Sequence, residues 1–137
     1  MIKKTALLTL LFCLVDLGVH PQVVAGEMSI TPQQTYDGMK KKEVLLIDVR
    51  EKEELTEGMA EGAQWFPFSK IKADSEEWKQ FTAKLPKDKK IVSYCAVGGR
   101  AGKVSDKLTK LGFATANMGG FSDWQKAHLP IKKPINQ

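Results

Sequence analysis

Short apolar runs alternate with amphipathic stretches, and this alternation constrains the fold more than any other feature of the sequence. The run at residues 43–49 (EVLLIDV) is almost continuously apolar and rich in branched side chains, which is typical of a strand buried on both faces of a parallel sheet. Further strands are predicted at residues 64–68, 90–94 and 113–118. Helical patterns lie between them, so we expect an α/β fold, with a central parallel sheet flanked by helices in three layers.

Capping residues and glycines mark the expected helix boundaries. Thr31 followed by Pro32 predicts the start of a helix that continues to about residue 41. Asp74, with Glu77 three residues later, resembles a capping box and predicts a helix start there. A helix is predicted over residues 100–111; it is capped by Gly112 and buries one face, formed by Ala101, Val104, Leu108 and Leu111. A short surface helix and a loop are expected within residues 51–61, and a turn at residues 119–120. The chain is then expected to end with a short helix over residues 121–127 and a loose surface strap over residues 130–137.

The amino terminus has the pattern of a secretory signal peptide. Lys3 and Lys4 precede an apolar run over residues 5–17, and small residues lead to a cleavage point after Ala25. We therefore predict a signal peptide over residues 1–25 and a periplasmic or otherwise exported protein. The apolar run is shorter than the roughly 20 residues that span a bilayer, so no stable membrane anchor is expected after cleavage.

The predicted mature chain, residues 26–137, has 112 residues (137 − 25), which fits one domain with one core. Without Lys3, Lys4 and Asp16 it carries 19 basic and 15 acidic residues, a net charge of about +4. The lysines are spread along the chain and are not grouped with aromatic residues, so nucleic acid is not an expected partner. A mild preference for small anions is the more modest inference.

Cys95 is the only cysteine of the predicted mature chain, because Cys13 lies in the signal peptide. Exported domains usually carry cysteines in even numbers for disulfides, whereas a lone cysteine is most often a small buried apolar residue. The neighbouring sequence therefore has to decide its role. One cysteine and one histidine, His128, do not make a zinc site; we expect His128 at the surface and no metal or other cofactor.

The segment at residues 94–100 (YCAVGGR) places Cys95 at the carboxyl end of a buried strand and just before a helix, where ligands of open α/β sheets bind. Glycines in the turn allow successive N–H groups to point inward, and the helix dipole adds its positive end. We therefore expect a loop that favours the thiolate of Cys95, which is the nucleophilic form. The loop residues are Ala96, Val97, Gly98, Gly99 and Arg100, and Arg100 and Lys103 would add cationic donors toward an anion.

Over essentially the whole predicted mature region the chain resembles the single-domain rhodanese-like sulfurtransferases, and it is similar to the small periplasmic ones. The landmarks are residues 47–50, 61–63, 94–100 and 119–121, together with Glu54, Gly58, Pro67, Trp124, Leu129 and Pro130. The resemblance implies the rhodanese α/β fold and a Cys95 persulfide that moves sulfane sulfur from thiosulfate to cyanide or a thiol acceptor. Family loops for this chemistry run six residues from the cysteine to the closing position, as from Cys95 to Arg100, whereas related phosphatases use seven; phosphoester hydrolysis is therefore disfavoured.

Several positions depart from the family pattern. Ala96 stands where many members have arginine, Ala101 stands where serine often occurs, and residues 58–60 (GMA) replace the usual Gly-His-Ile. We interpret the change at Met59 as one of packing. Because Ala96 removes a cation beside Cys95, the alternative function is a sulfur-carrier or redox-sensing module without steady-state turnover. A silent binding domain is disfavoured by the presence of both Cys95 and Arg100.

Asp48 and Arg50 match a family motif that links the sheet edge to the active-site side. We interpret Asp48 as a cap for the following turn, and Arg50 either as half of a structural ion pair or as part of the pocket mouth. The aromatic residues are expected in the core, with Trp65 or Phe66 as candidates for the pocket rim.

Overall fold

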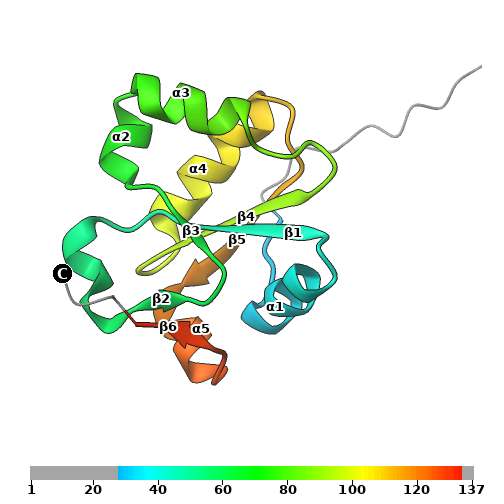
Figure 1. Ribbon diagram of the computed structural model, residues 1–137, viewed down its shortest axis with the longest axis vertical. Helices are drawn as coiled ribbons and strands as arrows, with labels where there is room; N and C mark the ends of the chain where they lie inside the picture. Colours follow the sequence, from blue (N-terminus) through cyan, green and yellow to red (C-terminus); the bar gives the residue numbers. More distant parts are fainter. Residues whose placement is uncertain (1–27, 134–137) are drawn as a thin grey trace, which may run out of the picture.

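The part of the chain described by the computed structural model, residues 28–133, is built on a parallel sheet of four strands in the order β3-β1-β4-β5 (Figure 1). β1 (Val44–Asp48) and β4 (Lys90–Cys95) are the central strands, and β3 (Gln64–Trp65) and β5 (Thr115–Gly120) are the edges. Asp48, the last residue of β1, is opposite Tyr94 of β4. This register brings the carboxyl ends of β1 and β4 together.

Helices cover both faces of this sheet (Figure 1). α2 (Phe68–Lys72), α3 (Glu76–Ala83) and α4 (Gly99–Lys110) lie on one face, and α1 (Pro32–Lys40) and α5 (Phe121–Lys126) lie on the other. A 3₁₀ helix, η1 (Lys52–Glu57), follows β1, and β2 (Met59–Ala60) pairs with β6 (Ile131–Lys132) in a small antiparallel ribbon beside α5. The predicted three-layer α/β architecture is confirmed.

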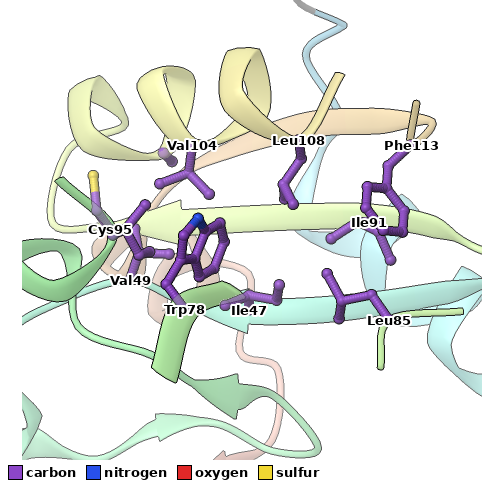
Figure 2. Close-up of a cluster of buried hydrophobic side chains, with 11 residues drawn as sticks. Ile47, Val49, Trp78, Leu85, Ile91, Cys95, Val104, Leu108 and Phe113 are labelled. Atoms are coloured by element: carbon purple, nitrogen blue, oxygen red, sulfur yellow. The ribbon is translucent and has the colours of Figure 1, made fainter. Parts of the chain in front are cut away.

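Each face of the sheet has its own cluster of buried side chains. Ile47 belongs to the cluster under α2, α3 and α4, which also contains Trp78 and, at one end, Cys95 (Figure 2). Its neighbour Leu46 belongs to the opposite cluster, which contains Trp124. Successive side chains of a strand point to opposite faces, and both faces are covered here, so β1 has to be apolar without alternation.

Several predicted boundaries are confirmed. The Thr31 hydroxyl accepts a hydrogen bond from the N–H of Gln34 at 3.1 Å, and the Gln34 side chain accepts one from the N–H of Thr31 at 3.1 Å, which makes a capping box for α1. Gly112 follows α4 with a φ of 84°, in the left-handed region that favours glycine. His128 is exposed, as expected.

The prediction that Asp74 caps a helix is wrong. Ser75 is the N-cap of α3, and its hydroxyl accepts a hydrogen bond from the N–H of Trp78 at 3.2 Å. Asp74 has a φ of 52° and lies in the connection from α2, a short helix that the sequence pattern did not indicate. Because α2 ends at Lys72, Asp74 completes the turn out of one helix and leaves the capping position to Ser75.

Three further segments differ from expectation. Leu111 is 51% exposed, because α4 ends at Lys110 and Leu111 already lies in the turn. Gly119 and Gly120 continue β5, where they pair with Tyr94 and Cys95, so they do not form a separate turn. Within the predicted loose strap, residues 131–132 form β6.

The predicted signal peptide, residues 1–25, and the last four residues of the tail lie outside the described residues. Between residues 28 and 133, none of the helices has the length and apolar character that crossing a bilayer requires. The export prediction therefore stays a prediction.

Candidate active site

Cys95 is the last residue of β4, and its side chain lies beneath the loop that leads into α4. The residue is only 1% exposed, and its Sγ accepts a hydrogen bond from the backbone N–H of Gly98 at 3.0 Å. In Figure 2 the sulfur atom points away from the hydrophobic cluster and toward the first turn of α4. Two surface cavities, of about 480 Å³ beside Phe113 and about 360 Å³ beside Val44, are lined by other residues. The candidate site comprises the buried sulfur and the loop that covers it.

Gly98 gives the loop its bend. Its φ is 99°, and a Cβ at this position would lie 3.2 Å from the Cα of Gly119. The positive φ favours glycine here, and the close approach to Gly119 leaves little room for a side chain. Gly99, in contrast, is the first residue of α4, and a Cβ there would meet no atom within 4 Å. The expectation that glycines shape the turn therefore applies to Gly98 and not to Gly99.

The first turn of α4 supplies further backbone donors. The N–H of Gly102 donates to the carbonyl oxygen of Gly98 at 2.9 Å, so the N–H groups of residues 99–101 precede the first bond of the helix and have no acceptor within it. They point out of the positive end of the helix dipole. The sulfur of Cys95, which accepts a hydrogen bond from the N–H of Gly98, thus lies beside the positive end of α4.

Strand β5 holds the loop from its other side. The Asn117 side-chain amide donates to the carbonyl oxygen of Gly98 at 3.1 Å, and the Asn117 side-chain oxygen accepts from the N–H of Gly119 at 2.9 Å. A Cβ at Gly120 would lie 2.3 Å from the carbonyl oxygen of Ala96, so glycine is required there as well. Neither Asn117 nor Gly120 was predicted from the sequence as a site residue. Paired glycines at the end of a strand were the available signal, since they mark a close approach of backbone.

Arg100 is held by a bidentate ion pair with Glu54 of η1. Its Nη1 lies 2.6 Å from Oε2, and its Nη2 lies 2.7 Å from Oε1. The hydrogen bond with Glu54 raises the pKa of Arg100, and the charge of Cys95 contributes less in the same direction. The same hydrogen bond lowers the pKa of Glu54 to about 2. Arg100 was predicted as a donor toward an incoming anion, and Glu54 was named only as a family landmark.

Asp48 and Arg50 form a buried ion pair behind the loop, so Arg50 does not line a pocket mouth. Arg50 Nη2 lies 2.6 Å from Asp48 Oδ2, and the Tyr94 hydroxyl donates to the same oxygen at 2.5 Å. Burial alone lowers the pKa of Arg50, but the hydrogen bond and charge of Asp48 outweigh it, so the pKa is raised. Asp48 Oδ1 accepts from the backbone N–H of Arg50 at 3.0 Å, which confirms the predicted cap.

The other sequence-predicted residues lie around the loop. Val97, at its tip, is 88% exposed, and Lys103 is exposed one turn into α4. Trp65 is 39% exposed and its Nε1 donates to the carbonyl oxygen of Arg50 at 2.8 Å, whereas Phe66 is partly buried and packs against the core. Residues 28–133 contain no group of His, Cys, Asp and Glu side chains that could hold a metal ion.

Comparison with known proteins identifies the class to which this fold and loop belong. The sequence profile of the Rhodanese-like domain matches residues 31–127, and the chain belongs to this family. It is 33% identical over 122 residues to MoeZ of Mycobacterium tuberculosis, a probable adenylyltransferase/sulfurtransferase; the match covers 87% of this chain but spans only 30% of MoeZ. It is 26% identical over 113 residues to the thiosulfate sulfurtransferase GlpE of Actinobacillus succinogenes, covering 77% of this chain and 96% of GlpE. A rhodanese-related protein of Thermoplasma volcanium has a similar structure, with a TM-score of 0.63, 29% identity, and coverage of 77% of this chain and 97% of that one.

Proposed function

We propose that this protein is a thiosulfate sulfurtransferase that carries sulfane sulfur on Cys95 and passes it to cyanide or a thiol. One observation carries the proposal. Cys95 Sγ lies at the carboxyl end of β4, beneath the first turn of α4, and accepts a hydrogen bond from the backbone N–H of Gly98. Membership of the rhodanese-like family and the likeness to GlpE, itself named a thiosulfate sulfurtransferase, support it.

The chemistry divides into two displacements at sulfur. The Cys95 thiolate attacks the outer sulfur of thiosulfate, a new S–S bond forms, and sulfite leaves with the electron pair of the broken S–S bond. The persulfide anion on Cys95 is then stabilised by backbone donors that are already in place, so little reorganisation is needed. Cyanide or a thiolate attacks the outer sulfur of the persulfide, forms thiocyanate or a new persulfide, and regenerates the Cys95 thiolate.

Intact-protein mass spectrometry tests the first displacement directly. After treatment with thiosulfate we expect a gain of one sulfur atom, mapped to Cys95, and the loss of that atom when cyanide is added. Cys95→Ala is the matched control, because it removes only the sulfur from a side chain that is already small and buried. The proposal fails if no adduct forms, or if Cys95→Ala keeps the activity.

Two observations favour a second candidate, a sulfur carrier or redox sensor that loads once and does not turn over. Ala96 places no cation next to Cys95, and the guanidinium of Arg100 is already paired with Glu54. Both features weaken the attraction of the site for a dianion. Steady-state thiocyanate production separates the candidates, since a carrier would stop after one equivalent of sulfur per protein.

The site of action is proposed from the amino terminus alone. Lys3, Lys4 and the apolar run over residues 5–17 support export, with cleavage after Ala25 leaving residues 26–137 as the working domain. Amino-terminal sequencing of protein recovered from the periplasm should begin at Gly26. An intact amino terminus in the cytoplasmic fraction would contradict this.

A further inference from the structure

Arg100 is the only cationic residue of the loop from Cys95 to its closing position, and its guanidinium is already engaged. Both of its terminal nitrogens donate to the Glu54 carboxylate, at 2.6 and 2.7 Å. A bidentate pair of this kind occupies two of the five N–H donors of the guanidinium and compensates its charge, which weakens the attraction of Arg100 for an oxyanion. An incoming anion therefore meets a neutral pair.

Glu54 is held in place independently of Arg100. Its Oε2 also accepts a hydrogen bond from the backbone N–H of Glu51 at 2.7 Å, which is part of the capping box of η1. Its backbone carbonyl oxygen accepts from Arg50 Nη1 at 3.0 Å, and Arg50 belongs to the buried ion pair with Asp48. The Glu54 carboxylate is thus held in position by contacts other than the one with Arg100, and Arg100 pairs with it there.

The two partners are only partly shielded from water. The side chain of Glu54 is 33% exposed and that of Arg100 is 27% exposed. At this exposure an ion pair contributes little to stability. The charges of both side chains are nevertheless close enough to the loop to act on an anion bound there. A change in the charge of either partner should therefore alter anion binding more than folding.

From this arrangement we infer that Glu54 is a specificity-determining residue: by neutralising Arg100 it makes the site favour singly charged sulfur donors, such as thiosulfonates, over dianionic thiosulfate. The inference rests on the proposed function, because it assumes that Cys95 accepts sulfur. The two donors suit a comparison, since they react in the same way. In each, the thiolate bonds to the terminal sulfur and the S–S bond breaks; thiosulfate releases sulfite, and methanethiosulfonate releases methanesulfinate.

The test compares the rate constants for loading Cys95 from thiosulfate and from methanethiosulfonate, both followed by intact mass. Loading is measured in a single turnover, so the comparison holds for an enzyme and for a carrier. Glu54→Gln keeps the shape of the side chain and an oxygen that can accept the Glu51 N–H, and it releases the charge of Arg100. We expect the thiosulfate-to-thiosulfonate ratio to rise about three- to tenfold in this variant, because the second charge of thiosulfate then meets an unneutralised arginine.

Two further variants make the result specific. Glu57→Gln removes one negative charge from the exposed end of the same helix, and we expect the ratio to change by less than about twofold because solvent screens that charge. In the double variant Glu54→Gln with Arg100→Gln, the summed charge of these two positions is zero, as it is in the wild type. The thiosulfate-to-thiosulfonate ratio should therefore return to within about twofold of the wild-type value. If Arg100 gripped thiosulfate directly in the wild type, the double variant would instead lose thiosulfate loading selectively.

The outcomes separate the inference from the proposed function. Loading by both donors with an unchanged or lower ratio in Glu54→Gln would overturn the inference and leave the sulfur-accepting role intact. A failure of wild-type Cys95 to load from either donor would overturn the proposed function itself. Should Glu54→Gln fold poorly, the double variant still tests the inference, because a selective loss of thiosulfate loading in it would contradict the neutralisation of Arg100.

Discussion

The molecule contains two arginine–carboxylate pairs at the same end of its sheet, and they differ in surroundings. In each pair a guanidinium nitrogen lies 2.6 Å from a carboxylate oxygen. The side chains of Asp48 and Arg50 are 0% and 4% exposed, whereas those of Glu54 and Arg100 are 33% and 27% exposed. Arg50 also donates to two backbone carbonyl oxygens, so it joins β1 to η1 and to the start of β2.

The difference in burial assigns the two pairs different tasks. Separating a buried pair leaves a charge without water or a partner, which is costly, so Asp48 and Arg50 must stay together for the fold to persist. A partly exposed pair can exchange its partner for water or an anion at small cost. Glu54 and Arg100 are therefore suited to tuning the chemistry of the loop, and Asp48 and Arg50 to holding the frame behind it.

The largest effect is expected when the buried pair is broken. Arg50→Leu should lower the free energy of unfolding by about 3–5 kcal/mol, because Asp48 would be left buried and unpaired. Arg100→Gln, which removes the arginine of the exposed pair, should lower it by less than about 1 kcal/mol. Urea unfolding of both variants at neutral pH measures the contrast. Equal losses of stability would remove the distinction between the two pairs.

A smaller effect is expected from the hydroxyl that completes the buried pair. Tyr94→Phe removes the donor to Asp48 and leaves the buried N–H of Ala60 without its acceptor, which lies at 3.0 Å. We expect a loss of about 1–3 kcal/mol in the free energy of unfolding. Tyr36→Phe is the matched control, because Tyr36 packs on Trp124 through its ring and should lose much less.

The same hydroxyl provides a spectroscopic check. Burial raises the pKa of Tyr94, and the charge of Asp48 raises it further. Absorbance titration of the folded protein should therefore show one tyrosine that ionises only when the protein unfolds at high pH, and this tyrosine should be missing from Tyr94→Phe. Ionisation of Tyr94 while the protein is still folded would contradict the buried network.

The elements that sequence predicts well are those whose cause is local. The continuous apolar run of β1 predicts a strand that is buried on both faces. Thr31 and Gln34 form a capping box within four residues of sequence. The position of Cys95 at the carboxyl end of β4 was predicted correctly, because the glycine turn that follows the apolar run marks where the strand ends. Asp74 was misassigned because the competing cap, Ser75, depends on where α2 ends.

The rest of the site depends on contacts between distant parts of the chain. Arg100 and its partner Glu54 are 46 positions apart, so the sequence shows two charges without showing that they cancel. Asn117 reaches the loop only because β5 lies next to β4. Arg50 left two interpretations open in the sequence, and only the packing around Asp48 decides between them.

The smallest effect concerns the pH dependence of the exposed pair. The pKa of Glu54 is lowered from 4.5 to about 2, chiefly by its hydrogen bond with Arg100. Its contribution to stability is therefore fully present above about pH 4.5 and is lost as the pH falls through about 2. The wild type should be more stable than Glu54→Gln at neutral pH by less than about 1 kcal/mol, because the pair is partly exposed.

The difference in the free energy of unfolding between the wild type and Glu54→Gln isolates the carboxylate of Glu54, since the two proteins have all other carboxylates in common. Urea unfolding from neutral pH to about pH 2 should show the gap between them closing only in the acid range, because glutamine does not titrate. Glu57→Gln is the matched control, because Glu57 lies at the exposed end of the same helix and takes no part in the ion pair. A gap that stays constant down to about pH 2 would mean that Glu54 and Arg100 are not paired in solution. Arg100 would then be available to anions, and the selectivity inferred for the loop would lose its physical basis.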